Sequence, residues 1–271
     1  MGTEVLRTDA DLVEGRLVER QNRFVLDVAF ENDDDRIEEV YLPETGRLTT
    51  VLADDATVVC EPVDDPDRRT AFTALAVHNG DVYVTVEAVR ANAMLAEAVE
   101  RDLVPFVGDW DLVRREPALP DGGRADLLVA ESGADAGERT EGANEDEGAG
   151  DGGNGTADGA TDNDFERYVE VKAVTHAEDG VGKFPDAPTK RGRRHLRDLT
   201  ALAEDGTPAS VVFVAMRPDV AVVRPFREID PDFGDALAAA AEAGVGIHAV
   251  GSAFDPPVWS LAAESIPVEI A

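Results

Sequence analysis

The chain has 271 residues, 57 of them acidic and 25 basic, and its formal net charge is -32 at pH 7. This length allows one large or two modest domains with real cores. The charge excludes a protein that holds nucleic acid or anionic lipid through a broadly basic surface. The single cysteine, Cys60, excludes an intramolecular disulfide framework and fits a reducing interior.

The acidity itself has two explanations. An acidic interaction tail would concentrate the charge in one block, whereas adaptation to a very salty cytoplasm would spread it over the whole surface. Asp and Glu occur from end to end, and the only lysines are Lys172, Lys183 and Lys190. We therefore favour a protein of a halophilic archaeon, in which high salt screens the dispersed negative charge.

The expected location follows from the apolar segments. The N-terminal stretch MGTEVLRTDADLVEG lacks the apolar core of a signal peptide. No apolar run approaches the roughly 20 residues that a membrane helix needs. We expect a cytoplasmic protein that does not enter the membrane.

Residues 11–87 consist of short alternating runs separated by charged turns. The runs have the spacing of strands: LVEGRLVERQ, RFVLDVAF, IEEVYLP, ATVVCEPV, TAFTALAVHNG and DVYVTVEAV. The stretch HNGD joins the last two as a hairpin. The pattern predicts a small antiparallel barrel or sandwich over residues 1–87, with the five-stranded oligonucleotide-binding (OB) barrel as one candidate. Pattern alone does not distinguish among small barrels.

Residues 88–271 combine helices and strands. The segment VRANAMLAEAVERD predicts a helix, and RADLLVA predicts a strand with Asp126 at its start. Further along, helix patterns alternate with strand patterns. The helices are expected at 189–206 and 230–244. The strands are expected at 167–175, 209–216, 221–226 and, as the last one, 245–254. This alternation predicts an α/β domain whose helices cover a mixed or parallel sheet.

Residues 131–166 interrupt this second domain. They contain no Val, Ile, Leu or Met and consist mainly of Gly, Ala, Asp and Glu. Such a segment cannot bury enough surface to offset the entropy lost on ordering it. A long loop adds little closure entropy per residue, so the core tolerates it. We predict a disordered acidic insertion between two strands that can still be neighbours.

One candidate site lies on the strand after the insertion. In YVEVKAV, apolar residues alternate with Glu170 and Lys172, so the two charged side chains share one face of the strand. If Asp126 lies on the adjacent strand, two carboxylates meet, and such a pair can hold a hard cation such as Mg²⁺. A neighbouring lysine could then orient or deprotonate a metal-bound water. A solvated strand face is the other interpretation, but a lysine kept in an arginine-using chain favours the metal site, since arginine does not deprotonate at useful pH.

The helix pattern at 189–206 carries the second candidate site. Leu196, Leu199 and Leu202 form an apolar stripe, and His195 projects near Leu202. Another face of the helix gathers Lys190, Arg193, Arg194 and Arg197. Together with Arg191 they form the most positive surface of the chain. This cluster favours phosphate binding. The alternative is a solvated helix face paired with nearby Asp and Glu.

Several segments carry a family resemblance. The chain resembles the sugar fermentation stimulation protein (SfsA) family in YVEVKAVTHAEDGVGKFPDAPTKRGRRHLRDL and in the later IDPDFGDALAAAAEAGVGIHAV. The hallmark of that family is an EVK strand followed by FPDAxTxRGxxHL. More weakly, RLVERQNRFVLDV, LPETGRL and RADLLV resemble its opening strands, its P-N-T-G turn and its S-R-x-D-F strand. Glu44 stands where the family turn usually has Asn, and Gly123 stands in place of Ser.

The resemblance implies an N-terminal OB barrel and a C-terminal domain similar to the PD-(D/E)xK nucleases. It also implies a DNA-binding protein linked to the regulation of sugar-utilisation genes. Carried over by motif, Asp126, Glu170 and Lys172 are the catalytic or metal-binding set, and Glu116 is an upstream acidic partner. The second motif implies phosphate or site contacts at two positions: Arg191 and His195.

Three functions remain open at this point. The first is a nuclease: Asp126, Glu170 and Glu116 bind Mg²⁺ or Mn²⁺, Lys172 positions the attacking water, and the basic helix holds DNA or RNA. The second is a non-catalytic DNA-binding regulator of sugar-metabolism genes. The third is a protein-protein module whose acidic insertion recruits a basic partner. The sequence leaves the kind of nucleic acid and the oligomeric state undetermined.

Overall fold

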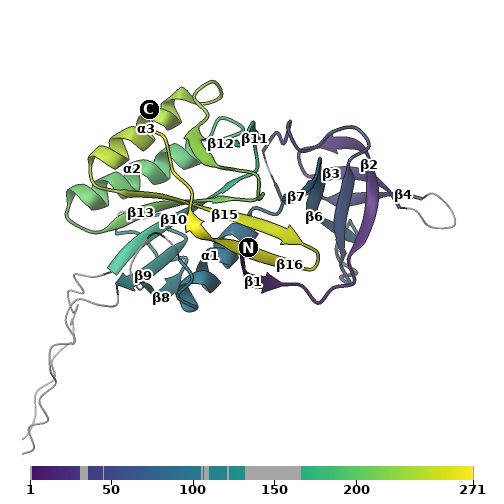
Figure 1. Ribbon diagram of the computed structural model, residues 1–271, viewed down its shortest axis with the longest axis horizontal. Coiled ribbons are helices and arrows are strands. Elements are labelled where there is room, and N and C mark those ends of the chain that lie inside the picture. Colours follow the sequence, from purple (N-terminus) through teal and green to yellow (C-terminus); the bar gives the residue numbers. More distant parts are fainter. Residues whose placement is uncertain are drawn as a thin grey trace, which may run out of the picture.

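The computed structural model describes residues 2–30, 36–44, 46–104, 106, 110–120, 122–131 and 166–270. A small barrel packs beside a larger α/β domain (Figure 1). The predicted acidic insertion lies outside the described residues except for its ends, Glu131 and Glu166, which belong to strands. Within the described part of the chain, no helix combines the length and apolar character needed to cross a membrane.

Five strands close the N-terminal barrel. Their order is β4-β3-β2-β5-β6, and a parallel pairing of β4 with β6 closes the ring. The strands are β2 (Val13–Asn22), β3 (Val25–Phe30), β4 (Ile37–Tyr41), β5 (Thr57–Pro62) and β6 (Phe72–Asn79), and β7 (Val82–Thr85) extends the sheet. Along β3, buried Leu26, Val28 and Phe30 alternate with more exposed residues, so one face of the strand lies on the core. The predicted small barrel is confirmed.

A seven-stranded mixed sheet forms the centre of the second domain. Its order is β1-β16-β15-β13-β10-β9-β8, with β10, β13 and β15 parallel and the outer pairs antiparallel. The strands are β1 (Thr3–Arg7), β8 (Trp110–Arg115), β9 (Leu127–Glu131), β10 (Glu166–Val174), β13 (Ala209–Ala215), β15 (Gly246–Asp255) and β16 (Val258–Ser265). A small second sheet consists of β11 (Ala177–Glu178), β12 (Val181–Phe184) and β14 (Val222–Pro225).

Helices cover both faces of the large sheet (Figure 1). Helix α1 (Val89–Glu100) packs on the face that carries Val169 and Val171. On the other face, α2 (Lys190–Glu204) and α3 (Pro231–Glu242) pack on the fully buried strand β13. Helix α2 begins where the Thr189 hydroxyl accepts a hydrogen bond from the Gly192 N–H at 3.0 Å. The predicted alternation of helices and strands over a mixed sheet is confirmed.

The two ends of the chain depart from the prediction. Residues 1–87 were assigned to the barrel, but β1 pairs with β16 in the large sheet, where Val5 is buried. The strand at 245–254 was predicted to be the last, but β16 follows it as an antiparallel neighbour. Only Trp259 and Leu261 of β16 are fully buried, so its alternating pattern is too short to predict a strand.

Two hydrogen bonds join β7, the strand that extends the barrel sheet, to the second domain. The Thr85 N–H donates to the Met216 carbonyl at 2.9 Å. The buried Trp259 Nε1 donates to the Thr85 hydroxyl at 3.0 Å. Because both partners of each bond are buried, the barrel and the second domain share a tight interface.

Candidate active site

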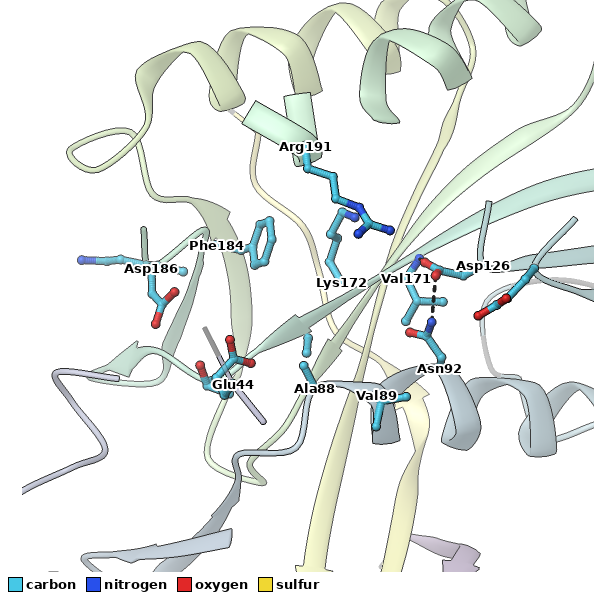
Figure 2. A pocket seen from close by; sticks show the side chains of 14 residues that line it. Glu44, Ala88, Val89, Asn92, Asp126, Val171, Lys172, Phe184, Asp186 and Arg191 are labelled. Carbon is cyan, nitrogen blue, oxygen red and sulfur yellow. Dashed lines mark hydrogen bonds between the residues drawn. The ribbon is translucent and has the colours of Figure 1, made fainter. Parts of the chain in front are cut away.

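A cavity of about 490 Å³ lies where the barrel meets the second domain. Its lining comes from both domains, with Glu44 on the barrel, Asn92 on α1, Lys172 on β10 and Arg191 on α2. Figure 2 shows Arg191 reaching into the cavity from α2 and Asn92 from α1, with Lys172 and Asp126 between them. The cavity is therefore a cleft lined by charged groups of both signs.

The strand register brings the predicted carboxylates together. Strands β9 and β10 are antiparallel, with Leu127 opposite Val169. Continuing this register by one residue sets Asp126 opposite Glu170, and the Asp126 N–H donates to the Val169 carbonyl at 3.1 Å. Lys172 follows two positions along the same face of β10. The predicted neighbourhood of these strands across the insertion is therefore present.

Glu170 lies behind Lys172, where it is only 3% exposed. Its Oε1 accepts hydrogen bonds from Lys172 Nζ and from His195 Nδ1. Burial alone would raise the pKa of the Glu170 carboxyl, but Lys172 and His195 outweigh it and hold the pKa below its ordinary value. Glu170 is therefore an ionised carboxylate held in place by Lys172 and His195. Of these two partners, only Lys172 lines the cavity.

Asp126 lines the cavity directly and is held on both oxygens. Its Oδ1 accepts from Asn92 Nδ2 at 2.8 Å, and its Oδ2 accepts from the Val171 N–H at 2.7 Å. Burial, and then the negative charge of Glu170, raises the pKa of Asp126, although these hydrogen bonds and Lys172 oppose the rise. The negative charge of Glu170 therefore disfavours the ionised form of Asp126.

His195, on the basic helix α2, links Glu170 to Arg191. Arg191 Nε donates to His195 Nε2 at 3.3 Å, so Nε2 carries the lone pair. The ring proton then lies on Nδ1 and is donated to Glu170. Since His195 is buried and on the first turns of α2, it fixes the position of Glu170 relative to the helix.

Glu116, the third predicted metal ligand, lies at the rim of the cavity. Its side chain is 72% exposed and pairs with Arg124 at 3.2 Å. Its backbone N–H donates to the Asp126 carbonyl at 2.8 Å, so the segment is near the site although its carboxylate pairs elsewhere.

The donor set determines which metal could fit. Mg²⁺ usually takes one or two carboxylates and keeps several waters. Among the residues that the structure describes, no group of three or more His, Cys, Asp or Glu side chains converges. Asp126 and Glu170 therefore suit a hard divalent cation that keeps open positions, and they do not suit a closed structural zinc site.

The basic face of α2 splits into two parts. Lys190, Arg191, Arg194 and Arg197 line a second hollow of about 570 Å³, together with Asp198. Arg191 also lines the first cavity, so the two hollows adjoin. Arg193, the remaining basic residue of the predicted set, points away and pairs with Asp230 at 2.6 Å and Asp232 at 3.2 Å.

Arg193 therefore has a structural contact that the sequence did not reveal. Asp230 is 1% exposed, and its carboxylate would lose its cationic partner in an Arg193→Ala variant. We expect a loss of about 2 kcal/mol in the free energy of unfolding, measured by urea denaturation, because a buried charge is left without its cation. Arg194→Ala removes only the ion pair between exposed Arg194 and Asp198 at 4.0 Å. It should lower the free energy of unfolding by less than about 0.5 kcal/mol. Equal losses in the two variants would contradict this assignment.

A barrel turn closes the far side of the cavity (Figure 2). Asp186 Oδ2 accepts from the Leu48 N–H at 3.1 Å, and Gly46 packs directly on the Asp186 carboxylate. Arg20 donates to the carbonyls of Gly46 and Arg47 at 2.9 and 2.7 Å. The FPDA motif thus holds the turn that carries Glu44.

Sequence reasoning missed some of the lining residues. Asn92 fixes Asp126 from α1, and an amide in the first turn of an Ala-rich helix was the signal that could have indicated it. Lys183, which had no predicted role, lines the cavity and pairs with Glu178 at 2.9 Å. Both residues come from segments whose positions depend on tertiary packing.

The fold and the site define a two-domain protein in which a closed five-stranded barrel covers one side of a carboxylate and lysine cleft. A family model described as the SfsA N-terminal OB domain matches residues 18–86, and one described as the sugar fermentation stimulation protein RE domain matches residues 150–257. The chain belongs to the SfsA family.

Similar proteins support this assignment over most of the chain. A sugar fermentation stimulation protein homolog of Acetivibrio thermocellus is 35% identical over 245 residues, which is 90% of each chain. One of Halorhodospira halophila is 37% identical over 242 residues, 88% of each chain. The structure of Pyrococcus furiosus SfsA in complex with Ca²⁺ is 24% identical and superposes with a TM-score of 0.78, covering 98% of this chain and 99% of that one. The predicted family and the OB barrel are confirmed.

Proposed function

We propose that this protein binds DNA or RNA and cleaves phosphodiester bonds with the help of Mg²⁺ or Mn²⁺, in a second domain of the PD-(D/E)xK nuclease type. The observation that carries the proposal is that Asp126, just before β9, comes opposite Glu170 of β10 when the strand register is continued by one residue, while Asp126 and Lys172 line the cleft. Two carboxylates next to a lysine suit a divalent cation, which usually takes one or two carboxylates and keeps several waters.

The residues of the chain have separate tasks in this proposal. A bound divalent cation would polarise the scissile phosphate and lower the pKa of its water. Asp126 and Glu170 hold the cation, Asp126 kept in place by Asn92 and Glu170 by His195. Lys172 lines the cavity and can orient the attacking water. Arg191, beside both hollows, can hold a phosphate next to the reacting one.

One relative supports a divalent cation in this fold. Pyrococcus furiosus SfsA forms a complex with Ca²⁺, a hard cation that prefers oxygen ligands as Mg²⁺ does. Its similarity to this chain extends over nearly the whole length. By analogy, Asp126 and Glu170 are the ligands that we propose here.

A specific observation favours a second candidate, a non-catalytic DNA-binding regulator of sugar-metabolism genes. Glu170 Oε1 is occupied by both Lys172 and His195, and both oxygens of Asp126 accept hydrogen bonds. Carboxylates satisfied in this way can be structural. A protein of this kind would protect promoter DNA without consuming it.

The two candidates differ in a cleavage assay. Purified protein is incubated with single- and double-stranded DNA and RNA in high KCl, with Mg²⁺, Mn²⁺ or EDTA, beside Glu170→Ala. The nuclease predicts metal-dependent degradation that Glu170→Ala abolishes. Equal background turnover by both proteins on every substrate, with binding retained, would leave the regulator as the function.

Nucleic-acid binding itself should depend on the hollow lined by α2. Each phosphate contact contributes about 0.7 to 0.9 to the slope of log affinity against log salt concentration. An Arg194→Ala/Arg197→Ala variant should therefore lower this slope by about 1.4 to 1.8 in titrations monitored by fluorescence anisotropy. An unchanged slope would place the phosphates elsewhere.

A further inference from the structure

The arginines of the barrel turns form a surface that the proposed cleavage site does not use. A hollow of about 440 Å³ is lined by Arg20, Arg23 and Arg47 on the barrel and by Ala187 and Pro188 just before α2. It places three arginines side by side in a protein with a net charge of -32. A positive hollow on such a surface is a local reversal of the overall field.

The arginines in this hollow differ from most others in the chain. Arg7, Arg16 and Arg69, for example, each pair with a carboxylate within 4.0 Å. Within the described ranges, the exposed side chains of Arg23 and Arg47 have no carboxylate in such a pair. Their charge is therefore available to an anion from outside.

Arg20 holds the two turns that present these charges. Its guanidinium donates to the carbonyls of Asn22 and Arg23 at 3.2 and 3.1 Å, and to those of Gly46 and Arg47 at 2.9 and 2.7 Å. With its donors spent on the backbone, Arg20 is a positioning residue. It fixes the β2–β3 turn and the turn at Gly46 side by side.

The arginine hollow is linked to three others by shared or neighbouring lining residues, and this series of hollows is here called the route. A hollow of about 420 Å³ further out on the barrel shares Arg20 and Arg47 with the arginine hollow. Pro188 lies two residues before Lys190, so their Cα atoms are at most about 7 Å apart, and Lys190 lines the hollow of α2. Arg191 then joins that hollow to the cavity of Asp126 and Lys172.

The β2–β3 turn also carries an exposed aromatic side chain. Phe24 follows Arg23 in the β2–β3 turn, where its N–H donates to the Asn22 side chain at 2.9 Å, and it is 44% exposed. Exposed rings next to a basic groove are the feature on which unpaired bases stack. Bases inside a duplex cannot stack on such a ring without leaving their partners.

We propose that a single strand of nucleic acid runs along this route, with its phosphates on Arg23 and Arg47, a base on Phe24, and its continuation over Pro188 to α2 and the cleft. This inference rests on the proposed function, because it names the form of the substrate and the path by which it reaches the site. A cavity of about 490 Å³ is the size of a small-ligand pocket, which admits a nucleotide unit of one strand.

The test measures binding without cleavage. Fluorescence anisotropy of a labelled oligothymidylate, and of a duplex of the same length, is recorded in EDTA at several KCl concentrations. Arg23→Ala/Arg47→Ala should weaken single-strand binding at least about tenfold and lower the salt slope by about 1.4. Phe24→Ala should weaken it about tenfold without changing the slope. Arg7→Ala/Arg16→Ala, which removes the same charge from exposed ion pairs outside the route, is the matched control.

The outcomes separate this inference from the proposed cleavage. Because metal is absent, a protein that never cleaves still gives the full binding result. If Arg23→Ala/Arg47→Ala binds like the unaltered protein, or the control is weakened as much, the route over the barrel is wrong. If the duplex binds as tightly as the single strand and Phe24→Ala has no effect, the preference for one strand is wrong.

Discussion

Replacing Lys172 with arginine should lower metal-dependent cleavage at least about 100-fold while leaving the fold intact. The guanidinium keeps a positive charge next to Glu170, whose buried carboxylate would otherwise lose one of its two partners. It cannot orient the attacking water in the same way, because its donors form a rigid planar fork, whereas lysine carries three rotatable donors on a compact ammonium. The misplacement of a positioning group by about 1 Å can cost about 100-fold, hence about 3 kcal/mol in the activation barrier.

Three measurements make this result specific. The initial cleavage rate with Mn²⁺ should fall, whereas the anisotropy-derived affinity for uncleaved strand in EDTA and the midpoint of urea unfolding should not. The control is Arg224→Lys, a basic exchange in an exposed pair with Glu269 that does not itself line the cavity. A Lys172→Arg protein that cleaves as fast as the unaltered one would mean that Lys172 supplies only charge.

The site was predictable where chemistry and strand periodicity coincide. Glu170 and Lys172 share a strand face because side chains alternate, and a family motif identified Asp126 as their partner. Two contacts of the site and its helix depend on tertiary packing, which strand periodicity does not indicate. Asn92 reaches Asp126 from a helix 34 residues earlier, and Arg193 pairs with Asp230, which lies 37 residues later.

The fold was predictable for similar reasons. The barrel strands form hairpins with near neighbours in sequence, and their alternation is strong enough to identify them. Strand β1 instead pairs with β16 at the other end of the chain, a contact that no local pattern indicates. The same limit applies to the cavity, one side of which is closed where the turn that carries Glu44 meets Asp186 from a distant segment.

Replacing Gly46 with alanine should weaken the contact between the barrel turn and Asp186, and we expect it to have the largest effect on stability. A Cβ at Gly46 would lie 2.3 Å from Asp186 Oδ2 and 2.4 Å from Oδ1. The carboxylate would have to leave its hydrogen bond with the N–H of Leu48, a residue that is 1% exposed. Steric strain and a buried donor without its acceptor together should lower the free energy of unfolding by about 3 kcal/mol. Urea unfolding of Gly46→Ala measures this loss.

The cause can be isolated with a double-mutant cycle. In Asp186→Ala the obstructing carboxylate is already absent, so the further change Gly46→Ala should cost less than about 1 kcal/mol, leaving a coupling of about 2 kcal/mol between the two sites. Because Glu44 and Asp186 both line the cavity, Gly46→Ala should also lower the cleavage rate. Strictly additive losses would mean that Gly46 acts through its own backbone, and that the FPDA motif does not hold the barrel over the cleft.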